Sequence, residues 1–179
     1  KYGCNPYQDN SFLLNQSHNQ THNQTQNQTN FFEIVNGTPG YINYIDAFHS
    51  WLLVSETHTA LNEVAAASFK HTAPAGVGLA LDGQEFTSDG IIANKYSAAA
   101  IEILKQKKGG KFIILRADRD ISYSSIEFRE IFGHVLSQRS NNEMVDFSYL
   151  ENVTSQNKNL PLQSKKDLLL ATITLKYTP

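Results

Sequence analysis

The sequence has a single cysteine, Cys4, among its 179 residues. One cysteine cannot form a disulfide within the chain, and it argues against a zinc site built on cysteine ligands. Low cysteine use fits a reducing compartment, so we expect a cytosolic protein. No apolar run approaches the roughly 20 residues of a membrane-spanning helix. The formal net charge of −2 gives no electrostatic reason to expect nucleic acid or an acidic membrane as a partner.

Several motifs that mark common enzyme classes are also missing. The sequence contains no Gly-x-Gly-x-x-Gly, no Walker A loop and no Gly-x-Ser-x-Gly elbow. Zinc-dependent deaminases need His-x-Glu together with Pro-Cys-x-x-Cys, which a single cysteine excludes. These absences argue against dinucleotide-binding, P-loop, serine-hydrolase and zinc-deaminase chemistry.

What is present is an ordinary composition for a folded protein, with 40% apolar and 18% charged residues. The length suits one good core. The chain starts at Lys1 with no signal segment, and it stops directly after a strong helical pattern. Both ends look like cuts, so we interpret the chain as a piece of a larger protein.

Residues 15–30 form a low-complexity tract of Asn, Gln, Thr and His. The tract has no apolar residue, so burial cannot offset the entropy of ordering it, and we expect a disordered surface loop. Other interpretations remain open. The tract could be an interaction module, it carries His18 and His22 at a metal-like spacing, and it contains glycosylation sequons at Asn15, Asn19, Asn23 and Asn27.

The remaining pattern alternates between strands and helices, which predicts an α/β fold. We expect strands at 31–35, 64–69 and 111–115, with a further strand at 126–136. Apolar spacing predicts helices at about 42–61 and 96–108. A capping arrangement of Ser164 with Asp167 is expected to open a last helix. The stretch between Gly76 and Ser88 is rich in glycine and has no clear pattern.

Lys70 and His71 form the most suggestive pair in the chain. They follow the apolar run 64–69, and Pro74 and Gly76 are expected to turn the chain sharply after them. Ligands of open α/β sheets bind outside the carboxyl ends of strands. A histidine there can accept a proton near neutral pH, and a lysine can hold an anion or a developing oxyanion. A surface lysine beside a loop-capping histidine is the alternative.

A second dense block covers residues 36–51 and includes a Gly-Thr-Pro-Gly turn. His49 lies beside the apolar stripe of the first helix, so we interpret it as structural, and Trp51 is most simply a core residue. His58 and His134 have no partner that the sequence identifies.

The opening residues 1–8 resemble the Arg-Tyr-Gly-x-Asn-Pro-His-Gln signature of one enzyme family. That family joins AICAR transformylase to IMP cyclohydrolase, and the signature opens its formyltransferase domain. Further blocks resemble the family in the same order, at residues 36–51, 65–76, 88–93, 136–142 with 145–146, and 171–178.

The resemblance implies a role for each matching residue. His71 matches the family's proton acceptor, and Lys70 matches the residue that stabilises the transition state. Four further positions match residues that bind or adjoin the AICAR nucleotide, namely Lys1, Tyr2, Asn43 and Asp89. The implied reaction moves a formyl group from 10-formyltetrahydrofolate to the 5-amino group of AICAR.

The resemblance also implies a cytidine-deaminase-like three-layer α/β fold without zinc, and a homodimer whose sites use residues of both subunits. Residues 1–179 would be an incomplete formyltransferase domain, mainly its first half. Lys1 stands where the family has Arg, and Tyr7 where it has His. The family carries a longer segment between the positions of Gly76 and Ser88, a second half-domain and a cyclohydrolase domain. The alternative is therefore an inactive fragment that binds only the nucleotide or a full-length partner.

Overall fold

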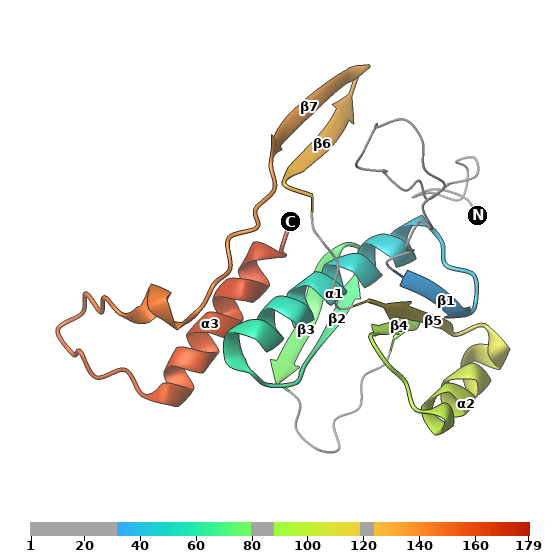
Figure 1. Cartoon of the computed structure of the whole chain (residues 1–179), viewed down its shortest axis with the longest axis horizontal. Helices are drawn as coiled ribbons and strands as arrows, with labels where there is room; N and C mark the ends of the chain where they lie inside the picture. The colour runs from blue at the N-terminus through green and yellow to red at the C-terminus, as the bar shows by residue number, and fades with distance from the viewer. Residues whose placement is uncertain (1–31, 80–87, 119–123) are drawn as a thin grey trace, which may run out of the picture.

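The computed structural model describes residues 32–79, 88–118 and 124–179, which form a mixed α/β structure (Figure 1). The helices and strands are, in chain order, β1 (Phe32–Asn36), α1 (Tyr41–Leu61), β2 (Ala65–Lys70), β3 (Ala73–Leu79), β4 (Gly90–Ala93), α2 (Ala98–Gln106), β5 (Ile113–Ala117), β6 (Ile126–Ile131), β7 (His134–Arg139) and α3 (Leu162–Lys176). Short 3₁₀ turns, η1 (Lys107–Gly110) and η2 (Phe147–Leu150), precede β5 and α3. The low-complexity tract 15–30 lies outside the described residues.

β5 is the middle strand of a three-stranded sheet with the order β1-β5-β4. It pairs antiparallel with β1 and parallel with β4. Its run Ile113–Leu115 is buried, as expected for a central strand covered on both faces. Gly90 of β4 backs directly on Ile113, because a Cβ at position 90 would lie 2.7 Å from the Ile113 Cβ. The close pairing of β4 and β5 therefore requires glycine there.

Helix α2 connects β4 to β5, and a polar cap and a half-buried tyrosine fix its start. The Ser97 hydroxyl accepts a hydrogen bond from the Ala100 N–H at 3.1 Å, which is an ordinary N-cap. The Tyr96 hydroxyl donates to the Leu115 carbonyl at 2.7 Å. Burial raises the pKa of Tyr96 well above its ordinary value, so the phenol stays neutral and keeps this bond across the physiological range.

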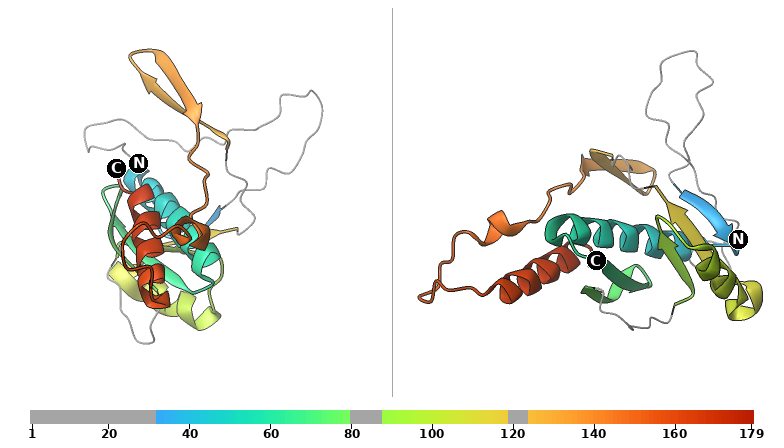
Figure 2. Two further views of the ribbon diagram at one scale, coloured as in Figure 1. Left: turned by 90° about the vertical axis from the view of Figure 1, so that its left-hand side faces the viewer. Right: turned by 60° about the horizontal axis from the view of Figure 1, so that its bottom comes forward.

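Helix α1 is the central support of the fold and runs through the middle of the molecule (Figures 1 and 2). The β2–β3 hairpin packs on it, and so does α3. The main core lies between these elements and contains Leu53, Leu61, Val145, Leu169 and Ile173. No helix among the described residues is both long and apolar enough to cross a membrane.

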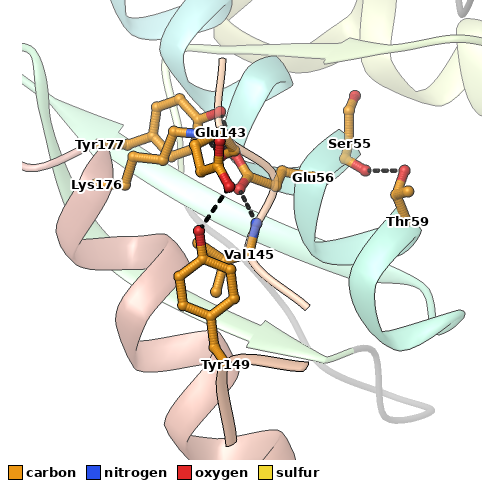
Figure 3. Close-up of polar contacts among 8 residues, drawn as sticks. All are labelled: Ser55, Glu56, Thr59, Glu143, Val145, Tyr149, Lys176 and Tyr177. Carbon is orange, nitrogen blue, oxygen red and sulfur yellow. Dashed lines mark hydrogen bonds and ion pairs between the residues drawn. The ribbon is translucent and has the colours of Figure 1, made fainter. Parts of the chain in front are cut away.

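A buried carboxylate ties α1 to the end of α3 (Figure 3). Glu56 is 3% exposed and accepts hydrogen bonds from the Lys176 ammonium at 2.8 Å and the Tyr177 hydroxyl at 2.7 Å. The Val145 N–H donates to its other oxygen at 3.2 Å. Lys176 also donates to the Glu143 carbonyl at 2.6 Å. The buried charge is thus paired and hydrogen-bonded, as burial requires.

The predicted strands and helices are confirmed in kind, with three corrections to the strands and one to the last helix. Pro74 and Gly76 do not turn the chain, because both lie inside β3, and the turn falls earlier, at His71–Thr72. The residues directly after Gly76 had no clear pattern in the sequence, yet they continue β3 to Leu79 and pair with β2. Residues 126–136 do not form one strand, because a turn at Phe132–Gly133 folds the segment into β6 and β7.

The last helix begins earlier than the predicted cap. Pro161 precedes its first residue, Leu162, and Ser164 lies inside the first turn with no capping bond. Asp167 instead accepts a hydrogen bond from the Gln163 side chain at 2.9 Å. Pro161 is the N-cap, and its carbonyl accepts a hydrogen bond from the Lys165 N–H at 3.0 Å.

Candidate functional site

Lys70 and His71 lie at the end of the β2–β3 hairpin. Lys70 is the last residue of β2 and pairs with Ala73, so His71 and Thr72 form a two-residue turn between them. Both turn residues have positive φ, 53° for His71 and 71° for Thr72. This backbone matches a type I′ hairpin turn, which usually takes Asn or Gly because other side chains are strained there.

A carboxylate of α1 holds this strained turn. The Thr72 N–H donates to Asp46 Oδ1 at 2.6 Å, across 26 residues of chain. Asp46 and Thr72 are both half-buried, while Lys70 and His71 are exposed. The backbone of the turn is therefore anchored to the helix, and the lysine and histidine side chains remain accessible to a ligand.

The start of α1 is itself built to place Asp46. Gly37 has a φ of 80° and ends β1, and Gly40 is the N-cap of the helix. The Asn43 side chain accepts a hydrogen bond from the Gly40 N–H at 2.8 Å. Asn43 and Asp46 are three residues apart and so lie on the same side of the helix. The dense block 36–51 thus fixes a helix start, and that helix carries the acceptor for the turn.

His49 lies one turn further along α1 and faces the same hairpin. Its ring centroid is 6.3 Å from that of Phe69 on β2. Its Nδ1 is buried, with no hydrogen-bond partner among the described residues. The packing fits the structural role expected from the sequence. Trp51, expected in the core, is half-buried and is not part of the main core cluster. His58 Nδ1 lies 2.9 Å from the Glu63 carbonyl, which supplies the partner the sequence did not reveal.

The structure brings only some of the predicted nucleotide-binding residues toward the turn. Asn43 lies one helical turn before Asp46 on α1. Asp89 lies at the start of β4, where its exposed carboxylate forms an ion pair with Lys108. Within the described residues, no hydrogen bond or ion pair connects Asp89 to the turn. Lys1 and Tyr2 lie outside the described residues.

Asp46 is the residue of the candidate site that sequence reasoning missed. It was part of the noted block, but nothing in the sequence singled it out as a partner of the Lys70–His71 step. The signal that could have indicated Asp46 was its place directly after an apolar residue, Ile45, on a helix predicted to be half-buried. In the part of the chain that the structure describes, no group of three or more His, Cys, Asp or Glu residues could hold a metal ion.

The arrangement can support proton transfer beside charge stabilisation. A neutral imidazole can take a proton from a weakly acidic nitrogen, and the neighbouring ammonium can offset negative charge on an oxygen. Holding both groups on one anchored turn reduces the entropy lost when they engage a substrate together.

Comparison with protein families gives a match over the whole chain. The AICARFT/IMPCHase bienzyme family matches the chain in two segments, residues 1–86 and 79–179, which together span its whole length. The first segment contains the Lys70–His71 turn, Asp46 and Asn43, and the second contains Asp89 and the β6–β7 hairpin.

Proposed function

The chain belongs to the AICARFT/IMPCHase bienzyme family of purine biosynthesis, and on this premise we propose that it carries formyl-transfer machinery. The proposed reaction moves the formyl group of 10-formyltetrahydrofolate to the 5-amino group of AICAR. The family match supports an enzyme of purine biosynthesis in general. The specific activity is our inference from the residues at the β2–β3 turn.

In the proposed reaction the 5-amino nitrogen of AICAR attacks the formyl carbon. A new C–N bond forms, and the bond between the formyl carbon and N10 of the folate breaks. His71 accepts the proton that the amine loses, and N10 gains a proton as tetrahydrofolate leaves. The Lys70 ammonium offsets the negative charge that develops on the formyl oxygen. We assign nucleotide binding to Lys1, Tyr2, Asn43 and Asp89.

The observation that carries this proposal is the anchored turn. A solvent-exposed Lys–His pair would be of little note on a mobile loop. Here the Thr72 N–H donates to Asp46 at 2.6 Å. The turn that this contact holds has a backbone conformation that costs about 1–2 kcal/mol for each residue other than glycine. Strain that is maintained by a specific contact is a feature of functional sites.

The same premise supports a finer description of the chain. We propose that residues 1–179 are an incomplete formyltransferase domain with a cytidine-deaminase-like architecture that works without zinc. The two family matches overlap at residues 79–86, within the interval where the family is expected to carry a longer segment. We further propose a cytosolic location and a homodimer for the full-length protein.

A second candidate function is nucleotide binding without transfer. It is favoured by the exposure of both Lys70 and His71, since the described residues do not enclose them. Excluding water from the reacting groups strengthens electrostatic catalysis, and an open turn lacks this advantage. On this alternative, the chain binds AICAR or a full-length partner and does not release tetrahydrofolate.

The experiment combines turnover with binding. Purified chain is mixed with AICAR and 10-formyltetrahydrofolate, tetrahydrofolate formation is followed by absorbance, and AICAR binding is measured by calorimetry. His71→Ala is compared with His134→Ala, because His134 also adjoins a hairpin turn and is exposed. Circular dichroism shows whether each variant folds.

The first candidate predicts turnover that His71→Ala abolishes and His134→Ala leaves unchanged. Binding without turnover establishes the second candidate. Turnover that survives in His71→Ala rules out the proton-acceptor role of His71. If neither binding nor turnover is detected, both candidates are rejected.

A further inference from the structure

Lys108 is a charged residue that the proposed reaction does not use, and its backbone is strained. It lies in η1, the short turn that joins α2 to β5 (Figure 1). Its φ of 53° and ψ of 36° are left-handed, a conformation that is costly for lysine and easy for glycine. Strain of this kind persists where surrounding contacts maintain it, and it clusters at functional positions.

The η1 turn that carries Lys108 is held in place from β1. Asn36, the last residue of β1, donates through its side-chain amide to the Gly110 carbonyl at 3.1 Å and to the Phe112 carbonyl at 2.7 Å. The Lys111 N–H donates to the Lys108 carbonyl at 3.3 Å and closes the turn. Lys108 is therefore presented from a backbone that is fixed on both sides.

Asp89 is fixed at the same edge of the sheet. β4 and β5 are parallel neighbours, so the residues that precede the two strands lie side by side. The Asp89 carbonyl accepts a hydrogen bond from the Ile113 N–H at 3.3 Å, which ties it to the start of β5. The Ser88 hydroxyl accepts from the Gly90 N–H at 3.2 Å and holds the other side of Asp89.

The two side chains meet across this edge. The Lys108 ammonium donates to Oδ1 of the Asp89 carboxylate, which leaves Oδ2 for another donor. The Asp89 side chain is 78% exposed, so a ligand can reach it. An exposed ion pair contributes little to folding stability. Its effect here is on the carboxylate itself, because an ammonium on one oxygen restricts the rotation of the group and offsets its charge.

We propose that Lys108 is a positioning residue for the nucleotide, and that it acts through Asp89. The ammonium holds one oxygen of the carboxylate and so directs the other toward a hydroxyl or amino donor of AICAR. It also offsets a negative charge that repels the phosphate of the nucleotide. The inference rests on the proposed function, because it requires AICAR to bind at Asp89.

Calorimetric titration of the whole chain with AICAR, and with the nucleoside that lacks its phosphate, tests the inference. Lys108→Gly removes the side chain and relieves the strained φ, so the variant should fold at least as well as the unmodified chain. We expect its dissociation constant to rise at least about threefold for both ligands. Lys108→Arg keeps the charge and should stay within about twofold of the starting value. Lys105→Ala, at an exposed lysine of α2, is the matched control and should also stay within about twofold.

A double-mutant cycle shows whether Lys108 acts through Asp89. In an Asp89→Ala background the carboxylate is already absent, so adding Lys108→Gly should change the dissociation constant by less than about twofold. A loss that persists in this background overturns the inference, because Lys108 then acts on the ligand directly. A loss seen with AICAR and not with the nucleoside also overturns it, because it indicates direct binding of the phosphate.

Two further outcomes separate this inference from the proposed function. AICAR binding that Lys108→Gly leaves unchanged overturns the inference alone, and nucleotide binding by the chain stands. No AICAR binding to the unmodified chain rejects the proposed nucleotide site, and the inference falls with it. Circular dichroism and urea unfolding of each variant distinguish weaker binding from a failure to fold.

Discussion

The two hairpins of this protein have similar backbones and opposite surroundings. Both turn through two residues with positive φ, at 53° and 71° for His71–Thr72 and at 51° and 74° for Phe132–Gly133. The first turn contains no glycine and is held by Asp46 on α1. The second contains Gly133, whose missing Cβ would meet nothing within 4 Å. Gly133 relieves one of the two positive φ angles in the β6–β7 turn, whereas both residues of the turn that carries the candidate site are strained and one of them is held by a tertiary contact.

The difference also separates two kinds of function. The β2–β3 hairpin is supported on α1 and presents two charged or titratable side chains, which suits chemistry that needs fixed positions. The β6–β7 hairpin, residues 126–139, which we call the arm, presents exposed apolar side chains, and these suit association. The following variants test the difference between the packed part of the molecule, which includes the β2–β3 hairpin, and the exposed β6–β7 hairpin.

Loss of the buried carboxylate of α1 should have the largest effect. Glu56→Ala leaves the Lys176 ammonium without its carboxylate partner in a site where that side chain is only 10% exposed. Removing one member of a buried ion pair costs about 3–5 kcal/mol. We expect this loss in the free energy of unfolding measured with urea. Glu130→Ala, on the exposed arm, is the control and should change it by less than about 0.5 kcal/mol. Equal effects would show that the arm is packed as firmly as the core.

Loss of the turn anchor should have an intermediate effect. Asp46→Ala removes the acceptor of the Thr72 N–H, and hydrogen bonds to charged groups contribute about 1.5–3 kcal/mol. We expect faster hydrogen exchange at the Thr72 amide and a reduced free energy of unfolding. Asp46→Asn keeps an oxygen acceptor and should recover part of both losses. A Thr72 amide whose exchange rate is the same in all three proteins would show that Asp46 does not hold the turn.

Exchanging the turn residues should have the smallest effects, of opposite sign. Thr72→Gly relieves a strained φ but adds entropy to the unfolded chain, so we expect a gain of up to about 1 kcal/mol. Gly133→Thr introduces the same strain into the arm, at about 1–2 kcal/mol. Because the arm lies outside the core, its loss should appear as faster local hydrogen exchange around residues 131–134, with little change in global stability. A fall in global stability for Gly133→Thr would contradict the separation of the two hairpins.

Much of this structure could be predicted from the sequence, where local pattern and burial agree. The apolar runs of β2 and β5 and the helical spacing of α1 are strong signals, and all three elements form near the expected bounds. The turns were harder. Pro74 and Gly76 are typical turn residues, yet both are accommodated in β3, and the chain turns at His71–Thr72, which no propensity favours.

In the candidate site, too, local features could be predicted and long-range contacts could not. The Lys70–His71 pair could be predicted as a candidate site from its position after an apolar strand, because that position is a local property of the sequence. The contact of Asp46 with Thr72 joins residues 26 positions apart, and only the packing of β2 on α1 creates it. The Glu56 network was likewise not predictable, since its partner Lys176 lies 120 positions further along the chain.

The central claim is that the substrate binds at the β2–β3 turn. The most direct test is a titration of the isotopically labelled chain with AICAR, followed through backbone amide resonances in NMR spectra. The account predicts saturable shifts at Lys70, His71 and Thr72, with no shift at Phe132 or Gly133, and weaker binding in Asp46→Ala. Saturable shifts that avoid residues 70–72, or that affect both turns equally, would contradict it.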